Sequence, residues 1–206
     1  MANLGQLALG SVVKINESGV PQEFYVARHD AYTAGRTLLV RRYVHSSRQY
    51  TNGVNNSYSS SPISAWLNGA YHDTLDPDIR AHIAEVVIPY TPDYPQSFVG
   101  DLNRKVFLLS LTELGATHYQ ARVEGTALSI ADILRFATTA SGSPVGQWTR
   151  TLVRDNYTAV FVFWGDGTHS FTDFLTNSGF GVRPAFTLPM SLTVHGPHIP
   201  NAMYPL

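Results

Sequence analysis

The apolar residues of this 206-residue chain occur in short runs separated by glycine, proline, serine and asparagine, and this spacing limits the fold more than any other feature. One of the longest runs, residues 159–164, is far shorter than the about 20 residues that a transmembrane helix needs. We therefore expect no membrane insertion. Short β-rich runs bounded by turn residues predict many short strands, and a chain of this length favours one domain.

Two kinds of element are expected along the chain. Runs rich in β-branched and aromatic residues predict strands at residues 11–15, 23–27, 36–44, 86–88, 106–109, 148–153, 158–164 and 180–188. Capping signals predict three short helices, which start at Ser61-Pro62, Asp76-Pro77 and Ser129-x-x-Asp132. The turn residues Asn16–Pro21 between the first two strands predict a hairpin. Residues 46–61 lack periodicity and are expected to form an exposed loop, whereas residues 165–167 are expected to form a turn. The expected fold class is α+β.

The two ends of the chain differ in character. Residues 1–188 are expected to form the domain, whereas residues 189–206 carry four prolines and little periodicity, which is typical of an extended tail. The first five residues lack a basic region followed by an apolar run. We therefore expect no signal peptide and synthesis in the cytoplasm.

Composition narrows the classes of function. The formal net charge is −1, so no positive field exists to concentrate nucleic acid, and nucleic-acid binding is disfavoured. The absence of cysteine excludes disulfides, thiolate catalysis and cysteine-ligated zinc. Only 14% of the residues are charged, against 44% hydrophobic. A surface made instead of Ser, Thr, Asn, Gly and Tyr suits a contact surface, and we expect a homo-oligomer.

Four blocks resemble a known family when they are taken in order. They are Ser61-Pro-Ile-Ser-Ala-Trp-Leu-Asn68, Lys105-Val-Phe-Leu-Leu-Ser-Leu-Thr-Glu-Leu114, Trp148-Thr-Arg-Thr151 and Gly181-Val-Arg-Pro-Ala-Phe186. Over about residues 10–188 the chain resembles a domain family of gut bacteria and their phages, which is similar to C-type-lectin-like and formylglycine-generating-enzyme-like domains. The resemblance implies a twisted antiparallel sheet flanked by two or three short helices, with long loops.

The same resemblance implies a binding segment. The C-type-lectin-like fold is also used by the variable proteins of diversity-generating retroelements, in which a C-terminal segment is varied to change the ligand. That segment would correspond to about residues 150–180, and its candidate ligand-binding residues are Asp155, Asn156, Tyr157, Phe161, Phe163, Trp164, Asp166, His169, Phe171, Asp173 and Asn177. Aromatic anchors with small polar neighbours suit a recognition surface. On a strand, however, alternation should bury about half of these aromatic residues in the core.

Histidine patterns do not predict a metal site. His29-Asp30 and His72-Asp73 are adjacent pairs, and neighbours in sequence point in different directions on a strand or helix. His195-x-x-His198 lies in the proline-rich tail, and no His-Glu-x-x-His motif is present. We expect these histidines to be scattered on the surface or satisfied structurally.

Calcium is also disfavoured. Asp155-Asn156 and Asp166 to Asp173 supply oxygen atoms, and three or more convergent carboxylates are normally needed. The Glu-Pro-Asn or Gln-Pro-Asp loop and the Trp-Asn-Asp strand of calcium-dependent lectins are missing. Residues 164–167 are more simply a hairpin turn. We expect no metal and no cofactor.

No catalytic residues are predicted. The chain has no Gly-x-Ser-x-Gly elbow and no phosphate-binding loop, and formylglycine generation would require cysteines that are absent. Arg183 is interpreted as a structural arginine that holds loops by hydrogen bonds to backbone or carboxylate. Trp66 and Trp148 are expected to pack in the core.

Together these features favour a non-enzymatic ligand- or receptor-binding domain, displayed on a phage virion at the tail or capsid surface. Its partners would be other virion proteins and a glycan or protein of the cell surface. The alternative is a structural virion component, such as a capsid decoration or tail protein, without an external ligand. An enzyme ranks third, since it would need a cleft with convergent polar groups.

Overall fold

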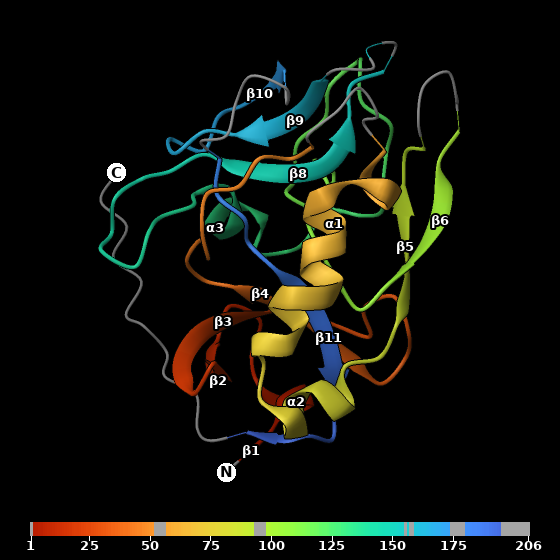
Figure 1. Ribbon diagram of the computed structural model, residues 1–206. Helices are drawn as coiled ribbons and strands as arrows, with labels where there is room; N and C mark the ends of the chain where they lie inside the picture. Colours follow the sequence, from red (N-terminus) through yellow and green to blue (C-terminus); the bar gives the residue numbers. More distant parts are fainter. Residues whose placement is uncertain are drawn as a thin grey trace.

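The computed structural model describes residues 2–51, 57–92, 98–154, 156, 159–173 and 180–194. Within these residues the chain forms four antiparallel sheets, of five, three, two and two strands, together with short helices (Figure 1). No helix in this part of the chain is long and apolar enough to cross a membrane. The mixed α+β class expected from the sequence is confirmed.

The five-stranded sheet joins segments from both halves of the chain. In spatial order its strands are β2 (Val12–Glu17), β3 (Val20–His29), β4 (Arg36–Arg41), β11 (Ala185–Pro189) and β7 (Val106–Phe107). Strand β11 crosses the middle of the molecule (Figure 1), where Phe186 packs against Phe24 with ring centroids 5.3 Å apart. The predicted strands in these regions are confirmed, although β11 begins only at Ala185.

The hairpin between β2 and β3 follows directly from its turn residues. Ser18 and Gly19 both have positive φ, at 51° and 78°. Two residues of this kind give a turn whose twist matches that of the flanking strands, and glycine adopts the conformation without steric cost. The predicted hairpin is confirmed with a shorter turn than expected.

A three-stranded sheet lies at the opposite end of the molecule (top of Figure 1) and consists of β8 (Gln147–Leu152), β9 (Ala159–Phe163) and β10 (His169–Asp173). Strand β9 lies in the middle, and β10 is an edge strand. Every residue of β8 and β9 is buried. Alternation should have exposed half of β9, but its second face is covered by other parts of the chain.

The helices are short and differ in how they start. Helix α1 (Pro62–Trp66) continues as a π-helical turn (Leu67–Tyr71) and a 3-10 turn (His72–Thr74), and its Ser61 hydroxyl accepts the Ser64 N–H at 3.2 Å as predicted. Helix α2 (Pro77–His82) also begins at the predicted proline, but the Asp76 carboxylate accepts from Asn16 at 2.8 Å instead of capping the helix.

Helix α3 (Ala131–Arg135) starts later than predicted. Its N-cap is Ile130, without a side-chain cap, so the Ser129 capping box is wrong. A backbone hydrogen bond from Ala131 to the Leu128 carbonyl, at 3.0 Å, closes a turn immediately before the helix. This turn leaves Ser129 outside the N-cap position.

The polar segment after residue 88 contains a strand that the sequence did not reveal. Strand β5 (Val86–Tyr90) pairs with β6 (Gly100–Arg104), and together they form a two-stranded sheet at the right of Figure 1. Strand β6 reads Gly-Asp-Leu-Asn-Arg, which has no apolar run to indicate a strand.

Residues 46–61 were expected to be exposed, and for the described residues this is wrong. Tyr50 and Tyr58 are fully buried, and the Tyr58 hydroxyl accepts the Leu108 N–H at 2.9 Å. The Trp148 indole donates to the Arg48 carbonyl at 2.7 Å. Buried tyrosines therefore anchor a polar segment that has no periodic pattern.

The start of the expected tail belongs to the fold. Strand β12 (Thr193–Val194) pairs with β1 (Ala2–Asn3), and the Leu4 N–H donates to the Leu192 carbonyl at 2.9 Å. Residues 189–194, expected to belong to an extended tail, are therefore part of the described fold. His195 and His198 lie outside the described residues.

Candidate ligand-binding surface

Arg150, at the start of the candidate segment, belongs to the core. Its guanidinium donates to both oxygens of Glu113, at 2.7 and 2.9 Å, and also to the carbonyls of Leu108 and Pro89. Arg150 is fully buried and Glu113 nearly so. Four acceptors compensate for the desolvation of the cation, so Arg150 fixes β8 to β5 and to the segment that follows β7, and it does not contact solvent.

A second buried acid extends this network. Glu124 accepts the Thr91 N–H at 2.7 Å and the Thr151 hydroxyl at 2.8 Å. Burial raises the pKa of Glu124, and the nearby Arg150 cation opposes that rise. Tyr32 donates to Glu113 at 2.5 Å, and burial together with this carboxylate raises the pKa of the Tyr32 hydroxyl well above its usual value. These groups hold loops on the sheet and offer no access to a substrate.

Arg183 makes the predicted hydrogen bonds to backbone carbonyls, but these bonds connect it with β4 and α3 and not with loops. It donates to the Arg41 carbonyl at 3.0 Å and to the Leu134 carbonyl at 2.7 Å, and its side chain is buried. Trp148 is buried in the core as expected, whereas Trp66 is only partly buried and carries the Arg48 guanidinium 3.8 Å from its ring centroid. The predicted structural role of Arg183 is confirmed.

The structure divides the predicted ligand-binding residues into three groups. Phe161 and Phe163 are fully buried, so their assignment to a recognition surface is wrong in this conformation. Asn156 is half-buried; Trp164, Asp166, His169 and Phe171 reach the surface. Asp155, Tyr157 and Asn177 lie outside the described residues, and of Asp173 only the backbone at the end of β10 is described.

Among the surface residues, His169 and Phe171 share one face of the β9–β10 pair. His169 pairs with Phe163 and Phe171 with Phe161, and directly opposite residues point to the same side of a sheet. The rings are 5.7 Å apart in the first pair and 6.0 Å in the second. Two buried phenylalanines therefore support two aromatic rings at the edge of the molecule.

A loop before α3 adds two further rings to this face. His118 lies 5.1 Å from Phe161, 6.2 Å from Phe171 and 6.5 Å from His169, measured between ring centroids. Tyr119 packs on His118 at 4.5 Å and is 83% exposed. We call His118, Tyr119, His169 and Phe171 the aromatic surface. The segment around His118 and Tyr119 carries no motif, so the sequence alone does not mark them as surface residues.

Trp164 lies on the opposite face of the same sheet. Its ring is 5.0 Å from Phe180, which in turn is 4.8 Å from Trp148. Trp164 follows Val162 by two residues, so alternation places it on the face that Phe161 and Phe163 do not occupy. The predicted set is therefore not one continuous surface.

The turn between β9 and β10 is formed as predicted. The Asp166 carboxylate accepts the Thr168 N–H at 2.9 Å and its hydroxyl at 2.6 Å, which lowers the pKa of Asp166. Among the described residues no group of three or more His, Cys, Asp or Glu side chains could hold a metal ion. His29 is hydrogen-bonded to Thr37 and to the Leu7 carbonyl, as expected of a structurally satisfied histidine.

Comparison with known proteins gives a family. Residues 34–190 match the model of a domain of unknown function, DUF6273. The chain belongs to this family. No curated protein and no solved structure matches the chain. The segment matched by DUF6273 includes the aromatic surface and all of its supporting sheet, whereas β2 and β3 precede it.

Proposed function

We propose that this DUF6273 chain is a non-enzymatic ligand- or receptor-binding domain with a C-type-lectin-like fold, displayed on a phage virion. The fold proposal is supported by the position of the four resembling blocks. The first forms α1, the third lies in β8, and the last leads into β11 at the centre of the main sheet. An antiparallel sheet with short flanking helices is what the resemblance implies.

The binding proposal depends on one observation, the exposure of aromatic rings on a rigid support. Tyr119 and Phe171 are 83% and 42% exposed, yet both stand beside His118, which packs on the fully buried Phe161. Exposed aromatic side chains on a fixed base can bury area on a ligand at low cost in conformational entropy. Cell-surface glycans and proteins both offer suitable apolar faces.

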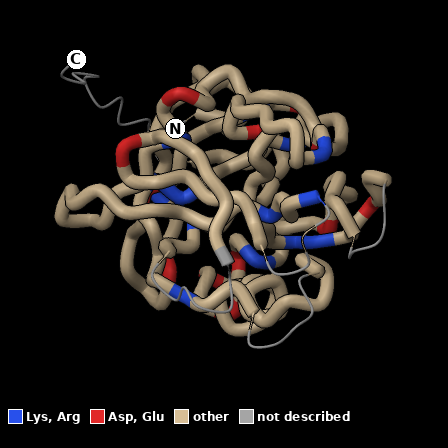
Figure 2. Tube along the Cα trace, turned by 90° about the horizontal axis from the view of Figure 1, so that it is seen from above, with Lys and Arg blue, Asp and Glu red and all other residues tan. Residues whose placement is uncertain are grey.

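The charged groups near the surface do not suggest an alternative chemistry. Basic and acidic residues are interspersed along the trace (Figure 2). The buried ion pairs Arg150–Glu113 and Arg41–Glu17 are enclosed and hydrogen-bonded within the protein. A catalyst would instead need convergent polar groups with perturbed pKa values in an open cleft.

The binding proposal is tested with labelled protein on a panel of bacterial cells and immobilised cell-surface glycans. The double variant Tyr119→Ser/Phe171→Ser is expected to weaken binding about tenfold or more, because it removes both exposed rings. Val20→Ser and Val87→Ser are matched controls, since these valines are exposed on β3 and β5, outside the aromatic surface. Equal binding by the double variant and the controls would overturn the assignment of the surface.

The virion proposal is tested separately by the genes that flank the coding sequence. Capsid or tail genes beside it support display on a particle, and an operon of metabolic enzymes would sink that part of the proposal. If the double variant instead fails to enter particles while no cell or glycan is bound, the chain is a structural virion component.

A further inference from the structure

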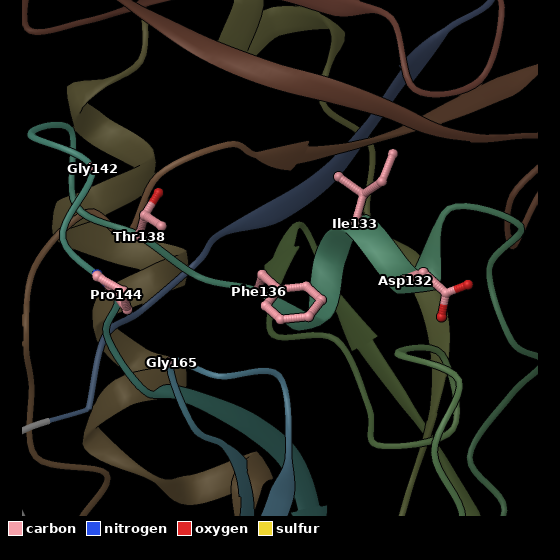
Figure 3. A pocket seen from close by; sticks show the side chains of 7 residues that line it. All are labelled: Asp132, Ile133, Phe136, Thr138, Gly142, Pro144 and Gly165. Atoms are coloured by element: carbon pink, nitrogen blue, oxygen red, sulfur yellow. The ribbon is translucent and has the colours of Figure 1, made fainter. Parts of the chain in front are cut away.

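A pocket of about 610 Å³ opens beside the β9–β10 turn (Figure 3). Its walls come from α3, from the segment that follows this helix, and from the turn itself. The lining residues are Asp132, Ile133, Phe136, Thr138, Gly142, Pro144 and Gly165. This volume lies within the range of about 300–1,000 Å³ that is typical of sites for small molecules.

The walls of the pocket are held in place by close packing. A Cβ at Gly165 would lie 2.9 Å from Pro144 Cβ, and one at Gly167 would lie 2.7 Å from the Phe136 ring. The segment after α3 is closed by a hydrogen bond from the Val145 N–H to the Ala137 carbonyl, at 2.9 Å. The pocket is therefore formed without a ligand.

The lining combines apolar walls with a single ionisable group. Ile133, Phe136 and Pro144 supply the apolar part, and the Phe136 ring remains 48% exposed. No lysine or arginine is among the described lining residues, and Asp132 is the ionisable one. The half-exposed Phe136 ring attracts a cation through its quadrupole, and the Asp132 carboxylate, whose side chain is 88% exposed, adds a solvent-screened negative charge at the rim.

The charges around the rim favour a cation as well. Asp166 stands between Gly165, which lines the pocket, and Gly167, which packs under Phe136, and hydrogen bonds from Thr168 lower its pKa. The nearest arginine, Arg135, lies 3.3 Å from Asp132 but also donates to the carbonyls of Leu114 and Gly115. Asp132 thus shares Arg135 with two carbonyl acceptors, and Asp166 adds a second carboxylate next to a residue that lines the pocket.

We propose that this pocket binds a small organic cation, a positively charged nitrogen on an apolar body. The apolar body packs against Ile133, Phe136 and Pro144, and the ammonium lies toward Asp132 and the face of the Phe136 ring. None of the residues that line this pocket belongs to the aromatic surface.

The test compares three probes of similar shape: phenethylammonium, neutral 2-phenylethanol and anionic 3-phenylpropionate. Binding is followed by NMR through the backbone amides of Gly142, Gly165 and Gly167 in the full chain. The ammonium is expected to bind more tightly than the alcohol, and the carboxylate more weakly than both. Equal affinity for ammonium and alcohol, or no shift of these amides at millimolar probe, would overturn the proposal.

Aspartate-to-asparagine variants test whether the carboxylate charges attract the cation. Asp132→Asn is expected to weaken phenethylammonium binding about twofold to fivefold, and Asp132→Asn/Asp166→Asn to remove its preference over the alcohol. Both changes keep side-chain size, and the Asp166→Asn amide oxygen can still accept from Thr168. Asp101→Asn, on the exposed side of β6, is the matched control and should leave the preference unchanged. An unchanged preference in the double variant would overturn the role of the carboxylates.

Discussion

The Arg150 guanidinium is bound by both carboxylate oxygens of Glu113, at 2.7 and 2.9 Å, with neither side chain in appreciable contact with solvent. The pair connects β8 to the turn that follows β7, and the remaining Arg150 donors reach the carbonyls of Pro89 and Leu108. Strand β8, strand β5 and the segment that follows β7 thus meet at one cation. This ion pair explains how a domain with long irregular segments can keep its surface loops fixed.

Removal of that cation should be costly. We expect Arg150→Met to lower the free energy of unfolding by about 3–5 kcal/mol, because it leaves the buried Glu113 carboxylate without its counter-ion. Urea denaturation followed by tryptophan fluorescence measures the change. Arg80→Met is the control: the Arg80–Asp73 pair is largely exposed, and its loss should cost about 0–1 kcal/mol. Similar losses in both variants would contradict the structural role of Arg150.

Two glycine-to-alanine changes are predicted to have opposite effects on stability. A Cβ at Gly181 would lie 2.5 Å from Val44 Cγ1 and 3.2 Å from the Gly146 carbonyl oxygen, so Gly181→Ala should destabilise the protein by about 1–3 kcal/mol. Gly69, in the helical turn after α1, has open space around its Cα. Gly69→Ala should therefore stabilise the protein by about 0.5–1 kcal/mol. Thermal unfolding of the two variants shows the direction of each change in stability. A lower melting temperature for Gly69→Ala than for the native protein would refute the prediction for Gly69.

Local signals predicted the parts of the fold that local chemistry decides. The Ser61-Pro62 helix start depends on one hydroxyl and the adjacent backbone, and the Ser18-Gly19 turn depends on backbone conformation alone. Arg183 was assigned correctly because a buried guanidinium needs acceptors wherever it lies. Each of these features is determined by residues close in sequence or by one group's own chemistry.

The candidate surface could be predicted only in part, because tertiary contacts decide which face of a strand is covered. Phe161 and Phe171 are equally aromatic in sequence, yet β9 is a central strand and β10 an edge strand, so only Phe171 reaches solvent. His118 and Tyr119 join them from a segment about 40 residues away along the chain. No local pattern encodes that approach.

The pH dependence of stability should depend in part on His45. Its ring packs edge-on against Trp66 and Tyr71, and burial lowers its pKa; the Arg41 and Arg48 cations add to this effect, while Glu17 opposes it. The unfolded chain then binds a proton more readily than the folded one. The contribution of His45 to the free energy of unfolding is fully present above the usual histidine pKa of about 6.5, and it is lost as the pH falls below that value.

We therefore expect the urea concentration at the unfolding midpoint to be lower at pH 5.5 than at pH 7.5 for the native protein. For His45→Gln we expect a smaller decrease. Both are measured by denaturation at the two pH values. His72, whose pKa is also lowered by burial, remains in the variant and should preserve part of the slope. An equal decrease in the urea midpoint in the variant and the native protein would show that His45 does not cause the pH dependence.

The last prediction concerns the contribution of residues 189–194 to stability. A chain that stops at Leu188 loses the β1–β12 pairing and the Met190 and Leu192 carbonyls that accept from Gly5 and Leu4. The fully buried Leu4 side chain depends on that pairing for its position. A chain that stops at Val194 keeps all of these contacts. We expect the shorter chain to unfold at a lower temperature than the longer one, and calorimetry of both measures the difference. Equal melting temperatures would mean that residues 189–194 add nothing to the stability of the fold, as expected for the start of an extended tail.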